Sequence, residues 1–145
     1  VEPWTSASAS ASRRNKAILV TGPMSNAGGN GRMTMEMTVQ ESDTTLVILR
    51  GRLNNETAES IERRCIGLAT SRKPMVIDLS GVSYIASMGL RMLLLVAKAI
   101  AAQGGKIALM APAPEVASVL RTAGIDRAIP VRASLDDARS AFARP

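Results

Sequence analysis

The chain has 145 residues, which is enough for one domain with a hydrophobic core. It contains no histidine and one cysteine, which excludes Ser-His and Cys-His nucleophile pairs, an internal disulfide and a cysteine-based metal site. The formal charge of +6 does not indicate nucleic-acid binding, because aromatic residues make up only 2% of the chain and much of the charge falls near the N-terminus.

Residues 1–32 differ in composition from the rest of the chain. They contain an Ala/Ser repeat at Ser6–Ser12, a Gly-rich run at Gly28–Gly31 and no sustained periodicity. This composition predicts a disordered tail or an N-terminal extension that is not native, with the domain in residues 33–145. The only apolar run, Ala17–Val20, is too short for a signal peptide, so we expect a cytoplasmic protein.

The first half of the domain predicts a hairpin, a helix and a strand. Alternation over 35–40, a polar turn at 41–44 and the apolar run 46–49 predict two paired strands. Asn54 can cap a helix over about 55–70, because apolar residues there recur every three or four positions. The run 75–79 is typical of a buried central strand, and Ser80-Gly81 predicts a turn after it.

The second half predicts a further alternation of helices and strands. A long helix runs from about Ser87 to Gln103, and its apolar stretch is interrupted by charge and too short for the ~20 residues of a membrane span. A strand at 106–110, a helix at 114–122, a strand at 128–131 and a helix at 135–143 complete the pattern. This order predicts a single α/β domain, with a mixed β-sheet of about five strands and about four α-helices packed against it.

Ser87, at the start of the long helix, is the candidate functional residue. A helix N-terminus exposes unpaired N–H groups and partial positive charge, which suit a phosphate placed there. A simpler interpretation, which the physics alone favours, is that the Ser87 hydroxyl caps the helix, with a contribution of about 1 kcal/mol. The two interpretations are compatible. Gly89, with no side chain, would let a partner or a kinase approach the backbone.

Other polar residues favour structural explanations. Cys65 fits a small apolar residue on a buried helix face better than a reactive thiol. Asp78 fits a hydrogen bond to the following loop better than a functional role, and Asp136 and Asp137 fit the helix dipole better than a metal. No carboxylate pair or metal motif stands at catalytic spacing. We therefore expect a protein without enzymatic activity, cofactor or metal.

Two motifs resemble the signature of the STAS domain family. Asp78-Leu-Ser80 followed by Ala86-Ser-Met-Gly-Leu90 is similar to the family's Asp-Leu-Ser strand end and its Asp-Ser-Ser/Thr-Gly-Leu element. Gly51–Ala58 is similar to the family's Gly-x-Leu-Asp-x-x-x-Ala segment at the start of its first helix. The resemblance covers roughly residues 35–143.

The resemblance implies a domain that binds other proteins. In the anti-sigma factor antagonist branch, an anti-sigma factor with serine kinase activity, which itself binds the ATP, phosphorylates the serine that aligns with Ser87. The unphosphorylated form binds this partner and frees the sigma factor, and phosphorylation releases the partner. The alternative is an accessory subunit of a lipid or solute ABC transporter, which docks permanently without phosphorylation. Either implies a hetero-complex, with no nucleic acid and no membrane insertion.

The predicted partner-binding residues are Asn54, Ala86, Ser87, Met88, Gly89 and Arg91. Three of them depart from the family pattern: Ala86 replaces an Asp, Met88 a Ser or Thr, and Asn54 an Asp. Ala86 removes a carboxylate that could help a kinase recognise Ser87, which makes the transporter alternative a serious rival. Met88 fits an adaptable apolar contact or a core position, and Arg91 fits a partner contact or a solvated surface residue.

Overall fold

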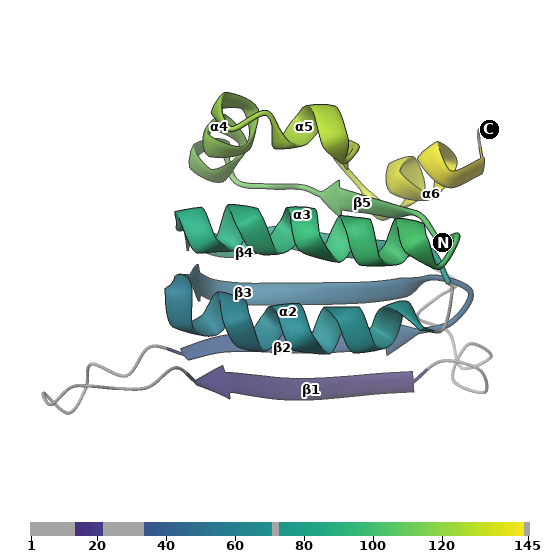
Figure 1. The fold of residues 1–145 in the computed structure, drawn as a ribbon, viewed down its shortest axis with the longest axis horizontal. Helices are drawn as coiled ribbons and strands as arrows, with labels where there is room; N and C mark the ends of the chain where they lie inside the picture. Colours follow the sequence, from purple (N-terminus) through teal and green to yellow (C-terminus); the bar gives the residue numbers. More distant parts are fainter. Residues whose placement is uncertain (1–13, 22–33, 71–72, 144–145) are drawn as a thin grey trace, which may run out of the picture.

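The computed structural model describes residues 14–21, 34–70 and 73–143, which form one α/β domain (Figure 1). The strands are β1 (Arg14–Thr21), β2 (Thr34–Glu41), β3 (Thr45–Leu53), β4 (Met75–Ile85), β5 (Ile107–Met110) and β6 (Val131–Arg132). The helices are α2 (Asn55–Ala69), α3 (Ser87–Ala102), α4 (Pro114–Thr122), α5 (Ile125–Ala128) and α6 (Leu135–Ala143). This confirms the predicted fold class.

The strands make one mixed sheet in the order β1-β2-β3-β4-β5-β6. The first three strands pair antiparallel, and β3 to β6 pair parallel. The predicted hairpin is therefore present as β2 and β3. Each parallel connection passes through at least one helix, as crossover units require.

Strand β1 was not predicted. Residues 14–21 pair with β2 along its whole length, from Arg14 opposite Glu41 to Thr21 opposite Thr34. The structure thus describes residues 14–21 as a strand, where the sequence predicted a disordered tail or a non-native extension, and the remainder of residues 1–32 lies outside the described ranges. The apolar run of β1 is only four residues long, and the strand forms because β2 presents a free backbone edge to it.

Strand β4 continues through the turn predicted at Ser80-Gly81 and ends at Ile85. Its pairing with β3 shifts register twice, between Ile48 and Arg50 and between Gly51 and Arg52, as β-bulges do. Gly81 permits a close approach at the first shift, because a Cβ there would lie 2.7 Å from Arg50 Cγ and 3.1 Å from the Leu49 carbonyl oxygen. The Gly therefore marks a bulge inside the strand and not a turn after it.

The two faces of the sheet are covered unequally. The larger core lies against the face covered by α2, α3 and α4, and its fully buried side chains include Leu49, Ile77 and Leu93. A smaller cluster on the other face combines Leu46, Val76 and Ala108 with Ala138 of α6. Figure 1 shows α2 and α3 side by side in front of the central strands. In the described ranges, no helix is long and apolar enough to cross a membrane.

The segment between α4 and β6 also differs from the prediction. Gly124 adopts the left-handed conformation, with φ at 77°, and starts the short helix α5. The strand predicted at 128–131 is consequently reduced to β6, which begins only at Val131.

Cys65 lies in the main core with no exposed surface, which supports its interpretation as a buried apolar residue. Burial raises the pKa of its thiol to about 12, so the reactive thiolate is scarce at neutral pH. We expect the native protein to react with a thiol reagent such as DTNB at pH 8 at least about 100-fold more slowly than the guanidinium-unfolded chain. Labelling at similar rates in both states would contradict this burial.

The same burial predicts how stability depends on pH. Unfolded chains release the thiol proton near the ordinary cysteine pKa of about 8.5, whereas the folded protein holds it up to about 12. The contribution of the protonated Cys65 thiol to the free energy of unfolding is therefore complete below the unfolded pKa. It is lost as the pH rises through the folded pKa. Urea unfolding should show a decline in stability from pH 8.5 upward that is smaller in Cys65→Ala.

Candidate functional site

The ends of β3 and β4 place the N-termini of α2 and α3 at one edge of the domain. The two strands are parallel neighbours, and each leads directly into its helix. Their ends are tied together by the Ala86 N–H, which donates a 2.9 Å hydrogen bond to the Leu53 carbonyl oxygen. In Figure 1 both helices start at the same side of the sheet, where the β3 arrow ends. The predicted residues Asn54, Ala86, Ser87 and Met88 therefore meet at this edge.

Asn54 is the N-cap of α2, as predicted. Its side-chain oxygen accepts a 3.0 Å hydrogen bond from the Thr57 N–H, and its own N–H donates to Thr57 Oγ1 at 3.0 Å, which completes a capping box. The Thr57 hydroxyl is buried and also donates to the Arg52 carbonyl oxygen at 2.9 Å. This network fixes the start of α2 against the end of β3.

The start of α3 differs from the prediction that the Ser87 hydroxyl caps it. Ala86 is the N-cap, with no side-chain hydrogen bond, and Ser87 is the first helical residue. The Gly89 and Leu90 N–H groups both donate to the Ala86 carbonyl oxygen, at 2.8 and 3.1 Å. Ser87 is exposed, and its hydroxyl makes no hydrogen bond to any residue that the structure describes. The hydroxyl is therefore open to modification and not engaged in a cap.

Gly89 faces the core, unlike the rest of the predicted set. It is buried, and a Cβ at this position would lie 2.9 Å from Ile85 Cγ1 and 3.0 Å from Leu53 Cγ. The expectation that Gly89 opens the backbone to a partner is therefore wrong, because the missing side chain makes room for core residues instead. The absent side chain lets the first turn of α3 pack on the ends of β3 and β4, which sets the position of Ser87.

The last residues of β3 and β4 also carry an exposed cation and an exposed aromatic ring, Arg52 and Tyr84, which the sequence analysis did not single out. Met88 is 38% exposed and Tyr84 is 41% exposed, so Met88 is a surface residue and not a core filler. The Arg52 guanidinium carbon lies 4.3 Å from the centre of the Tyr84 ring, a cation–π contact between paired residues of β3 and β4. The only sequence signal for this pair was that Tyr84 is the sole tyrosine.

The other polar residues considered in the sequence analysis lie apart from this network. Arg91 is exposed, one helical turn beyond Ser87, and forms no ion pair within the described part of the chain. Asp78 accepts a 2.9 Å hydrogen bond from the Ser80 N–H, the local role that the sequence favoured. Across residues 14–21, 34–70 and 73–143, no group of three His, Cys, Asp or Glu side chains could hold a metal ion.

The uncapped start of α3 predicts a stabilising substitution. An Asp at position 86 would place a carboxylate oxygen near the free N–H groups of the first turn, which contains no acidic residue. We expect Ala86→Asp to raise the free energy of unfolding by about 1 kcal/mol in urea titrations. Ala102→Asp, at the opposite end of the same helix, is the control and should be neutral or slightly destabilising. Equal effects of the two variants would contradict the assigned cap.

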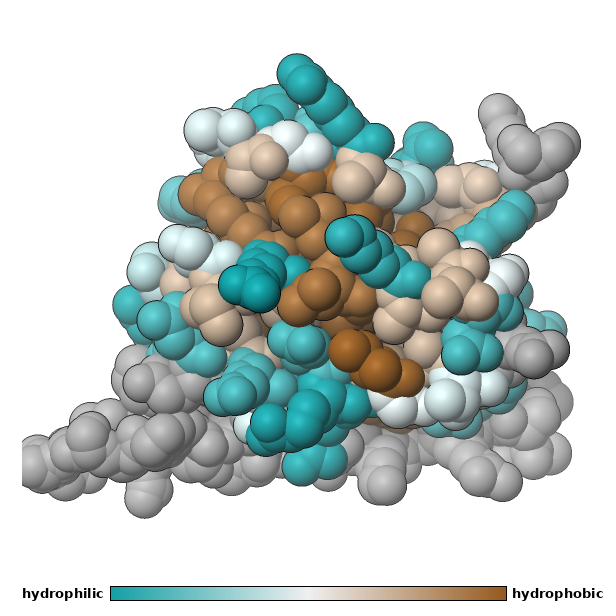
Figure 2. Space-filling view, viewed as in Figure 1, coloured by the Kyte–Doolittle hydropathy of each residue, from teal (hydrophilic) through white to brown (hydrophobic). Residues whose placement is uncertain are grey.

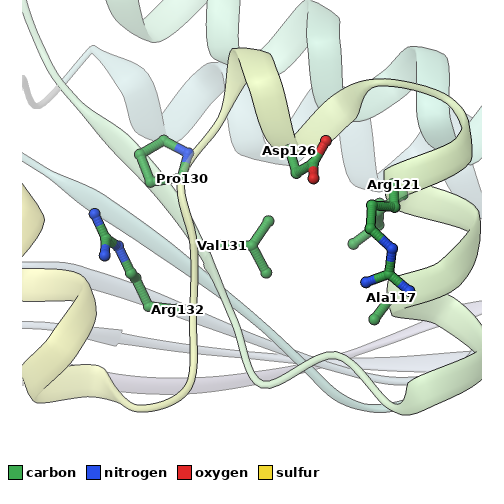
Figure 3. Close-up of a pocket in the computed structure, with 7 residues that line it drawn as sticks. Ala117, Arg121, Asp126, Pro130, Val131 and Arg132 are labelled. Atoms are coloured by element: carbon green, nitrogen blue, oxygen red, sulfur yellow. The ribbon is translucent and has the colours of Figure 1, made fainter.

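A separate pocket of about 440 Å³ lies between α4, α5 and β6. Figure 3 shows Arg121 and Arg132 on opposite sides of it, with Val131 between them and Asp126 above. The aspartate carboxylate opposes the positive charge of the arginines, so the lining does not select an anion. None of the residues predicted from the sequence lines this pocket.

Comparison with known proteins identifies the family of the chain. Residues 34–138 match the family described as STAS domain. A Bordetella bronchiseptica protein, named provisionally as the anti-sigma factor antagonist BtrV, is 33% identical over 110 residues that cover 74% of this chain and 95% of that protein. The crystal structure of an anti-sigma factor antagonist from Mycobacterium paratuberculosis superposes with a TM-score of 0.67 at 26% identity and covers 74% of this chain and 93% of that one.

A third relative, from Thermotoga maritima, is also described provisionally as an anti-sigma factor antagonist. Its crystal structure gives a TM-score of 0.60 at 27% identity and covers 68% of this chain and 88% of that one. The chain therefore spans nearly the whole length of each of these relatives.

Proposed function

Because the chain belongs to the STAS domain family, we propose that it is an anti-sigma factor antagonist, which binds an anti-sigma factor and thereby releases the sigma factor. The proposal assigns this activity to the domain predicted at residues 33–145, acting in the cytoplasm without a cofactor. The observation that carries it is the exposed Ser87 at the start of α3, whose hydroxyl makes no hydrogen bond within the described residues, beside the exposed Met88.

We propose that the partner is also the kinase that modifies Ser87. The Ser87 oxygen would attack the γ-phosphorus of ATP held by the partner, so that an O–P bond forms, the bond to the leaving ADP breaks, and the hydroxyl proton passes to a base of the partner. The chain supplies only the acceptor, which fits its lack of histidine. The first turn of α3 would then stabilise the phosphate through its N–H groups and helix dipole.

Phosphorylation would end the complex by changing the charge of the contact surface. The unmodified start of α3 presents a neutral serine and the exposed Met88 side chain. A phosphoserine adds a charge of about −1.5 to −2, which must be desolvated if the partner stays bound. A partner whose contact surface is apolar or acidic at this point would therefore dissociate.

One feature favours a second function, that of an accessory subunit of a transport ATPase that docks permanently. Ala86 offers no carboxylate to orient the Ser87 hydroxyl or to contact a kinase. In that case the same edge would bind its partner and Ser87 would never be modified.

Binding to candidate anti-sigma factors from the same genome tests the proposed function. Isothermal titration should show one of them forming a complex with the full chain, and in-vitro transcription should show release of its sigma factor. Met88→Asp should weaken this complex several-fold, because it places a charge in the contact surface. Val119→Asp, which changes a residue of nearly equal exposure on α4, is the matched control and should bind normally.

Two results would contradict the proposal. One is that no candidate anti-sigma factor binds while a transport ATPase subunit does. The other is that Val119→Asp weakens the complex as much as Met88→Asp, because the edge at the start of α3 would then not be the contact surface.

A further inference from the structure

The outward face of α3 forms an open apolar groove with a positive border. The groove has a volume of about 520 Å³ and is lined by Arg91, Leu94, Leu95, Ala97, Lys98, Ala101 and Ala128. All but Ala128, at the end of α5, come from α3. Leu94 is 37% exposed, a large apolar side chain that the domain leaves uncovered. Figure 2 shows apolar surface, in brown, across the middle of the helical layer, interrupted by hydrophilic side chains in teal.

The charges of this groove have one sign only. Helix α3 contains two charged residues, Arg91 and Lys98, and no Asp or Glu. Both line the groove, both are exposed, and neither has an ion-pair partner among the residues that the structure describes. A groove with an apolar floor and cations alone is complementary to an apolar stripe bordered by carboxylates.

The spacing of the two cations determines how far apart the acidic residues of a matching partner must lie. Arg91 and Lys98 are seven positions apart on one helix, which is two turns or about 10 Å. A second helix packed along α3 would present carboxylates at the same separation if they too stand seven positions apart. We propose that this groove binds an amphipathic helix of a partner protein, with an apolar stripe and two acidic residues two turns apart.

The groove lies on the same face of α3 as Ser87. At 100° per residue, Ser87, Arg91, Leu94 and Lys98 fall on one stripe, opposite the buried residues Met92, Val96 and Ile100. Ser87 and Arg91 are four positions apart, so their Cβ atoms lie about 6 Å from each other. This step rests on the proposed function: a phosphate on Ser87 would pair with Arg91 and compete with the acidic residue of the bound helix.

Fluorescence anisotropy with two synthetic peptides tests the groove without any natural partner. The probe is a labelled amphipathic helix with a leucine stripe and glutamates seven positions apart, and its control carries glutamines in their place. We expect the full chain to bind the glutamate peptide at least about fivefold more tightly at low salt. Arg91→Gln combined with Lys98→Gln should abolish this preference, and Arg91→Glu with Lys98→Glu should prefer a lysine version of the peptide.

Apolar variants locate the binding on α3. Leu94→Asp should weaken both peptides, whereas Ile66→Asp, which changes an equally exposed residue on α2, should not. Equal binding of the glutamate and glutamine peptides, absence of binding up to millimolar concentration, or equal loss in Leu94→Asp and Ile66→Asp would each overturn the proposal.

The link to Ser87 has its own readout. Ser87→Asp should weaken the glutamate peptide about two- to threefold in the otherwise unchanged protein and have no effect in the Arg91→Gln background. An equal effect in both backgrounds would overturn the competition for Arg91 and leave the groove intact. Failure to find an anti-sigma factor would overturn the proposed function but would not change the result with the peptides.

Discussion

Ser87→Asp is expected to weaken binding of the anti-sigma factor at least about tenfold, while Ser87→Ala binds as tightly as the unmodified protein. The Asp places a carboxylate at the first position of α3, on the exposed edge beside Met88. A partner surface that excludes water there would have to desolvate this charge or tolerate it beside its own groups. Isothermal titration of the two variants against the same partner measures the difference.

The effect of Ser87→Asp on stability should have the opposite sign. A carboxylate at a helix N-terminus interacts favourably with the dipole, so Ser87→Asp should stabilise the fold by about 0.3–1 kcal/mol. Loss of affinity together with unchanged or higher stability in urea would therefore identify a charge effect and not unfolding. Equal affinity of the Asp and Ala variants would refute the switch, although the fold would stand.

Gly89→Val is expected to lower the free energy of unfolding by about 2 kcal/mol. The position has no room for a side chain, because a Cβ would already lie 2.9 Å from Ile85 Cγ1 and 3.2 Å from Leu53 Cδ2. The β-branched side chain must push α3 away from the ends of β3 and β4, and this outweighs the gain in helix propensity of less than about 1 kcal/mol. Urea unfolding monitored by circular dichroism gives the value.

A second glycine provides the matched control. Gly67 lies in α2, is exposed, and has nothing within 4 Å of an added Cβ. Gly67→Ala should therefore stabilise the protein by about 0.5–1 kcal/mol. If Gly89→Val proved as stable as the parent, α3 would not pack on the strand ends as described, and the position of Ser87 would have to be revised.

Most of the α/β alternation could be predicted from the sequence because it depends on local periodicity. The helices at 55–70 and 87–103 and the hairpin before them follow from apolar spacing and punctuation by glycine and proline, and the structure confirms them. Strand β1 could not be predicted in this way, because its pairing with β2 is a contact between chain segments and its own apolar run is short.

Glycine was the main source of error in predicting the structure from the sequence. Gly81 suggested a turn, but it occupies a bulge where β4 passes close to Arg50. Gly89 suggested an open backbone, but it faces the core. In both cases glycine is needed because another segment of the chain packs closely against it, and a single sequence does not show such contacts.

The cap of α3 was predicted to within one residue. The pattern predicted Ser87 as the cap of α3, whereas the cap is Ala86, where the family signature has an Asp. This difference bears on the proposed phosphorylation, because a serine hydroxyl that is not engaged in a cap is available as an acceptor. Asn54 was placed correctly, since its capping box uses only residues within the same turn.

The most direct test of the switch is intact-mass and site-mapping spectrometry of the full chain after incubation with ATP and a bound anti-sigma kinase, beside Ser87→Ala. We predict one added phosphate, located on Ser87, absent from Ser87→Ala, and accompanied by release of the partner. A partner that binds the chain tightly in the presence of ATP yet leaves Ser87 unmodified would contradict the switch and favour permanent docking instead.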